Sequence, residues 1–135
     1  MDRTALQRIA EVRIREARVL LGKDFYDGAY YLSGYSVECA LKACIAKQTK
    51  AGDFPDKQFV NKSYTHDLSV LLQLAGLQNE LESLDHRVQV NWAVVKDWSE
   101  ERRYELDVTK QDALDYISAC TARKYGVLPW LRRRW

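Results

Sequence analysis

The sequence predicts an all-α fold, an antiparallel up-and-down helical bundle of four to five main helices. Apolar residues recur every three or four positions through most of the 135 residues. No segment alternates in polarity like a strand for more than four residues. Hydrophobic residues make up 47% and charged residues 30%, a composition typical of one compact globular domain, which we expect to span residues 1–135.

The first two helices are expected to form the longest pair. Apolar positions predict a first helix over Thr4–Leu21, and Gly22 is a suitable helix stop. Asp24 and Asp27 resemble a capping box at the start of the second helix. That helix is expected to run from about Phe25 to Thr49, roughly seven turns, which makes it the central element of the bundle.

The middle of the chain predicts a loop and two helical stretches. Lys50–Tyr64 is polar and without period, so we expect a loop with one short turn. Thr65 is a suitable N-cap for a short helix that ends at Ala75. Leu77–Ser99 carries apolar residues at helical spacing and is expected to be kinked near His86.

The last helix and the C-terminal tail have clear local signals. "TKQD", Thr109–Asp112, predicts a capping box, Gly126 predicts the end of that helix, and Pro129 can start a final turn. The tail "LPWLRRRW" combines arginines with tryptophans. It suits phosphate contact with base stacking, or equally a frayed amphipathic terminus or a segment that docks on a partner subunit.

Charge and cysteine content exclude several classes of protein. A net charge of +2 is too small to indicate a nucleic-acid binder by itself. The three cysteines, Cys39, Cys44 and Cys120, match no CxxC pair and are expected to be buried, reduced thiols. The charged N-terminal segment lacks the apolar centre of a signal peptide, and no run is long enough to span a membrane, so we expect a cytoplasmic protein.

The second helix, "YDGAYYLSGYSVECALKACIAK", contains glycines that a helix interior disfavours by about 1 kcal/mol each. Close packing against a neighbouring helix or a second subunit would offset that cost. We therefore expect a dimer contact at Gly28, Tyr31, Gly34 and Tyr35. Base stacking by the tyrosines is the alternative.

Polar residues of this helix and of later segments are the candidates for chemistry. Glu38 and Lys42 lie one helical turn apart among apolar residues, so a partly buried ion pair is expected, with His66 or Arg103 as a further partner. Glu38, Lys42 and His66 are the expected structural polar cluster. We expect no metal site, and common phosphate-loop and hydrolase motifs are absent from the sequence.

Three segments together resemble the HEPN family, helical domains named for nucleotide binding in higher eukaryotes and prokaryotes. They are "YDGAYYLSGYSVECALKACIAK", "YTHDLSVLL" and "WSEERRYE". The resemblance implies a dimeric bundle, often from bacteria or archaea, that works beside a minimal nucleotidyltransferase-like partner, for example as toxin and antitoxin. The residues that match the family's motifs are Glu38, Leu41, Lys42, Thr65, His66, Arg103 and Tyr104.

Three functions remain open. Many HEPN proteins are metal-independent ribonucleases with an arginine followed four to six residues later by histidine, a motif this sequence lacks. The leading hypothesis is a non-catalytic dimer that binds a nucleotide or RNA phosphate through Lys42, Arg103 and Tyr104, with no cofactor. The alternatives are a ribonuclease toxin that uses His66 and Arg103 as catalytic residues, and a protein interaction module.

Overall fold

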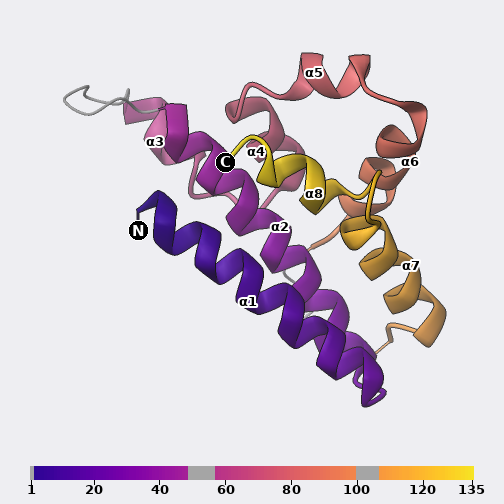
Figure 1. Ribbon diagram of the computed structural model, residues 1–135. Coiled ribbons are helices and arrows are strands. Elements are labelled where there is room, and N and C mark those ends of the chain that lie inside the picture. The colour runs from indigo at the N-terminus through magenta and orange to yellow at the C-terminus, as the bar shows by residue number, and fades with distance from the viewer. Residues whose placement is uncertain (1, 49–56, 100–106) are drawn as a thin grey trace.

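The computed structural model describes residues 2–48, 57–99 and 107–135, with the backbone alone at 57–59. Every regular element within these residues is a helix, which confirms the all-α prediction. The helices are α1 Arg3–Gly22, α2 Tyr26–Gln48, α3 Lys57–Lys62, α4 Leu68–Leu74, α5 Gln78–Ser83, α6 His86–Val95, α7 Lys110–Thr121 and α8 Val127–Arg132 (Figure 1).

The long helices α1 and α2 run side by side in opposite directions, and α4, α7 and α8 pack on α2 (Figure 1). One stripe of α1 faces inward, formed by Leu6, Ala10, Ile14 and Ala17. The Ser36 hydroxyl of α2 donates a hydrogen bond of 2.6 Å to the Ala10 carbonyl, which joins the two helices directly. Both helices end close to their predicted boundaries.

The turn between α1 and α2 does not contain the predicted capping box. Asp24 has a left-handed backbone (φ 67°), and its carboxylate accepts a hydrogen bond from the Tyr26 hydroxyl. The Asp27 carboxylate instead accepts from the backbone N–H of Val108, at 3.1 Å. The Asp27 carboxylate, which the local pattern assigned to a helix cap, therefore forms a long-range hydrogen bond instead.

Helix α4 begins later than predicted, because Asp67 and not Thr65 caps it. The Asp67 carboxylate accepts from the backbone N–H groups of Ser69 (2.9 Å) and Val70 (3.2 Å). The Thr65 hydroxyl accepts from the Asp67 N–H at 3.1 Å and so fixes the residues that lead into the helix. Carboxylates and hydroxyls both make good N-caps, which is why the sequence did not separate them.

The predicted kink near His86 is a complete break between α5 and α6. Asp85 caps α6, and its carboxylate accepts from the Arg87 backbone N–H at 2.9 Å. The predicted capping box at Thr109 and Asp112 is confirmed, with reciprocal hydrogen bonds of 3.1 and 3.2 Å. The capping box thus identifies the start of α7 correctly, whereas no cap was predicted at Asp85.

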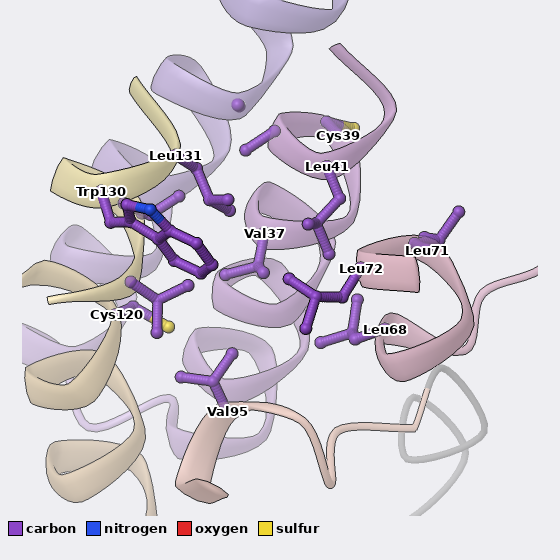
Figure 2. Close-up of a cluster of buried hydrophobic side chains, with 14 of the residues drawn as sticks. Val37, Cys39, Leu41, Leu68, Leu71, Leu72, Val95, Cys120, Trp130 and Leu131 are labelled. Atoms are coloured by element: carbon purple, nitrogen blue, oxygen red, sulfur yellow. The ribbon is translucent and has the colours of Figure 1, made fainter. Parts of the chain in front are cut away.

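Buried side chains of α1, α2, α4, α5, α6, α7 and α8 form the core, and Figure 2 shows a part of it around the middle of α2. The labelled side chains come from α2 (Val37, Cys39, Leu41), α4 (Leu68, Leu71, Leu72), α6 (Val95), α7 (Cys120) and α8 (Trp130, Leu131). Because α2 contributes buried residues on nearly every side, it is the central helix, as predicted.

The C-terminal tail docks on its own chain. Trp130 is buried, and its indole N–H donates to Glu80 at 3.0 Å. Arg134 binds the same carboxylate (2.7 and 2.9 Å), and Arg132 binds Glu11 at 2.6 Å. Trp130 is therefore unavailable for base stacking, and the tail packs on its own chain instead of fraying, while docking on a partner subunit stays a prediction.

Candidate functional site

A buried carboxylate on α2 brings together two of the residues that the sequence singled out. Glu38 is 2% exposed. Its Oε2 accepts a hydrogen bond from Lys42 Nζ at 3.2 Å, and its Oε1 lies 2.8 Å from His66 Nδ1. We call these three residues the Glu38 cluster.

Two elements position the cluster. Glu38 and Lys42 lie one turn apart on α2, so both side chains leave the helix on one face. His66 directly precedes Asp67, whose capping bonds fix the start of α4. Leu68, the first residue of α4, is fully buried and holds that helix end against the core. The imidazole is thereby held over α2.

Within the Glu38 cluster, side-chain exposure increases from Glu38 through Lys42 to His66. The side chain of Glu38 is 3% exposed, that of Lys42 21% and that of His66 45%. A buried carboxylate is costly without hydrogen-bonding partners, and here it has two. Since a carboxylate can only accept, His66 Nδ1 is the donor, and Nε2 of the neutral ring is then an acceptor.

Two neighbours of Glu38 on α2, Cys39 and Tyr35, carry groups that stay uncharged at neutral pH. Burial and the negative charge of Glu38 raise the pKa of the Cys39 thiol to about 11. Burial also raises the pKa of Tyr35, with a smaller contribution from Cys39. The guanidinium of Arg13 on α1 acts in the opposite direction on both, so Arg13 belongs to the surroundings of the cluster. Cys39 is therefore not a nucleophile.

The three cysteines are buried and form no disulfide, as predicted. Burial raises the pKa of Cys44 to about 12 and raises that of Cys120 further above its ordinary value. Within the described ranges, no three His, Cys, Asp or Glu side chains come close enough together to hold a metal ion. In the same part of the chain, no helix combines the length and apolarity needed to cross a bilayer.

The glycines of α2 have packing reasons within a single chain. Gly34 is buried beneath Trp98, and a Cβ built on it would overlap the indole ring. A Cβ on Gly28 would lie 3.1 Å from the Leu20 side chain of α1. The Trp98 contact explains Gly34 without a second subunit, whereas a small shift of Leu20 would accommodate a Cβ at Gly28, and the predicted dimer contact of both glycines stays a prediction.

Tyr31 and Tyr35 are half-buried on the same part of α2. Their rings stack with centroids 6.4 Å apart, and the Tyr31 ring lies 5.9 Å from that of Trp98. The two tyrosines and the indole therefore form a continuous aromatic edge beside the Glu38 cluster.

Arg103 and Tyr104, which were predicted to bind phosphate, lie outside the described residues. The predicted contact between Arg103 and His66 therefore stays a prediction. Sequence reasoning missed Arg13. No motif surrounds this arginine, and only the packing of α1 on α2 brings it near Cys39 and Tyr35.

Comparison with known proteins identifies the family. The HEPN domain model matches residues 4–122, which include α1 to α7. Searches of curated proteins and of solved structures gave no match. The chain therefore belongs to the HEPN family, and this membership implies a nucleotide- or RNA-related function.

Proposed function

We propose that this HEPN protein binds a nucleotide or RNA phosphate at the Glu38 cluster and does not cleave it. The observation that carries the proposal is the position of Glu38, which is buried and binds both Lys42 and the half-exposed His66. An ammonium has three hydrogens, and Glu38 accepts one of them. A phosphate above the carboxylate can accept another.

The local charges favour an anion over a cation. One carboxylate is matched by the Lys42 ammonium, and the Arg13 guanidinium, which pairs with Glu16, also lies nearby. Because Glu38 is buried, an approaching ligand meets the cationic side chains first.

The proposed assembly is a homodimer joined along the aromatic edge of Tyr31 and Tyr35. Half-buried tyrosines suit a subunit contact, since each ring offers apolar area with a polar end. Tyr35 lies within one helical turn of Glu38, and Tyr31 lies about two turns away. A dimer formed there would bring two phosphate sites close together, beside a nucleotidyltransferase-like partner in a toxin and antitoxin or related system.

Replacement of Lys42 with methionine tests the phosphate site. We expect weaker binding of a labelled single-stranded RNA, and a slope of log affinity against log salt that is smaller by about 0.7, the effect of one lost phosphate contact. Fluorescence anisotropy over a salt series measures both. Lys47→Met is the matched control, because Lys47 is an exposed lysine near the end of the same helix. An unchanged slope for Lys42→Met would contradict the proposed site.

A ribonuclease is the second candidate, and the contact between Glu38 and His66 favours it. A carboxylate that holds Nδ1 fixes the tautomer in which Nε2 can accept a proton, as a general base requires. An arginine would still be needed to stabilise charge on the phosphorus, and Arg103 is the predicted one.

Incubation with labelled RNA separates the two candidates. We expect no cleavage by the wild-type protein, and weaker RNA binding by His66→Ala than by His86→Ala. His86 is the matched control because it is the other histidine and is exposed at the start of α6. Cleavage by the wild-type protein that falls by about 100-fold or more in His66→Ala alone would replace the binding function with a nuclease.

A further inference from the structure

The outward face of α1 carries a groove that the proposed phosphate site does not use. One depression of about 520 Å³ is lined by Val12, Arg15, Glu16, Val19, Leu20 and, from α2, Leu32. A second of about 270 Å³ is lined by Ala5, Arg8, Ile9, Val12 and Arg13. Both depressions border Val12, and together they make a stretch of hollowed surface from Ala5 to Leu20, about 22 Å along the helix. We call it the α1 groove.

The floor of the α1 groove is a second apolar stripe on an already amphipathic helix. The buried residues of α1 all face α2 and the core. Ala5, Val12 and Val19 recur every seven residues along the outward side, and the two valines are 36% and 63% exposed. A seven-residue apolar repeat is the pattern by which one helix packs along another. The described residues leave this stripe largely uncovered.

One border of the groove is positively charged. Both glutamates of α1 form ion pairs with arginines of the same chain. Glu11 pairs with Arg132 at 2.6 Å, and Glu16 pairs with Arg13 at 2.8 Å. Arg8 and Arg15 are exposed, and their spacing of seven residues places them along the same side of the valine stripe. The groove therefore has an apolar floor and a basic edge.

We propose that the α1 groove binds an amphipathic helix of another protein, with apolar residues on the valine stripe and carboxylates against Arg8 and Arg15. Helix-in-groove recognition uses apolar anchors at this kind of spacing. Opposite charge along one border sets the orientation of the bound helix and speeds its association.

Charge disfavours a second copy of this chain as the occupant. In a parallel two-fold pair of α1 helices, Arg8 and Arg15 face the opposite border of the partner's stripe, where they find no free carboxylate because Glu16 already pairs with Arg13. In an antiparallel pair centred on Val12, Arg8 of one subunit comes beside Arg15 of the other, since both lie on the same side of the stripe. RNA is also a poorer match, because a floor of exposed valines offers no polar group to a nucleotide.

A synthetic peptide tests the proposal directly. The probe is a fluorescein-labelled amphipathic helix of about five turns, with leucine on one face and glutamate along one edge. We expect saturable binding to the full chain, weakened by roughly tenfold or more in Val12→Lys and in the Arg8→Glu, Arg15→Glu double variant. Val94→Lys is the matched control, because Val94 is 41% exposed on α6, outside the groove. A peptide with lysine in place of glutamate should bind much more weakly.

Three results would overturn the proposal. They are absence of binding, equal binding of the lysine peptide, and loss of self-association in light scattering for Val12→Lys, which would make the groove a contact between copies of this chain. Val19→Lys repeats the test at a more exposed position, so a folding defect of one variant does not decide it. The groove shares no residue with the Glu38 cluster, and the Lys42→Met experiment tests the phosphate site separately.

Discussion

Gly34→Ala is expected to destabilise the protein by about 3 kcal/mol, at the upper end of what overpacking costs in a well-packed core. The new methyl group would overlap the Trp98 indole, which is 4% exposed and has no room to withdraw into solvent. Urea unfolding followed by circular dichroism measures the change. Gly22→Ala is the matched control, because no atom outside its own local backbone lies within 4 Å of the added Cβ. There we expect a gain of about 0.5–1 kcal/mol, since alanine is preferred to glycine in a helix.

A second-site change shows whether Trp98 causes the effect. In a Trp98→Leu background, the smaller side chain leaves space for the methyl group, so Gly34→Ala should cost much less than in the wild-type protein. Equal costs in the two backgrounds would mean that the close packing of Gly34 and Trp98 is not the reason for the glycine.

Glu38→Ala is expected to destabilise the protein by up to about 3 kcal/mol. The change leaves Lys42 and His66 without their shared acceptor and opens a small cavity under α4. The loss stays below that of a fully buried ion pair because both partners reach solvent. Glu38→Gln keeps the shape and one acceptor oxygen, so its cost should be smaller. Denaturant unfolding at neutral pH compares the variants.

Glu82→Ala is the control for that measurement. Glu82 is an exposed residue of α5 whose carboxylate accepts from Gln78, and its loss should change the free energy of unfolding by no more than about 0.5 kcal/mol. A Glu38→Ala protein as stable as the Glu82→Ala protein would show that the cluster contributes little to the fold.

Local patterns in the sequence predicted most helices and the pair of Glu38 and Lys42, because helix periodicity, capping and ion pairs within one helix depend on residues a few positions apart. Contacts between distant segments were not predictable in this way. The carboxylate of Asp27 binds Val108, and the indole of Trp98 covers Gly34, although neither pairing follows from any repeat. Partial burial of Glu38 and Lys42 predicted a further partner but left His66 and Arg103 as alternatives, and the fold brings His66 to Glu38.

The docked C-terminal tail brings the last residues of the chain close to its first helix. The carbonyl of Trp135 accepts from the Gln7 side chain at 2.8 Å, and Arg132 binds Glu11, so the last residues lie against the first helix (Figure 1). A short flexible link could therefore join the two ends without disturbing the core. Opening the chain in an exposed turn, such as the one between α5 and α6, would then give a circular permutant with the same set of helix contacts.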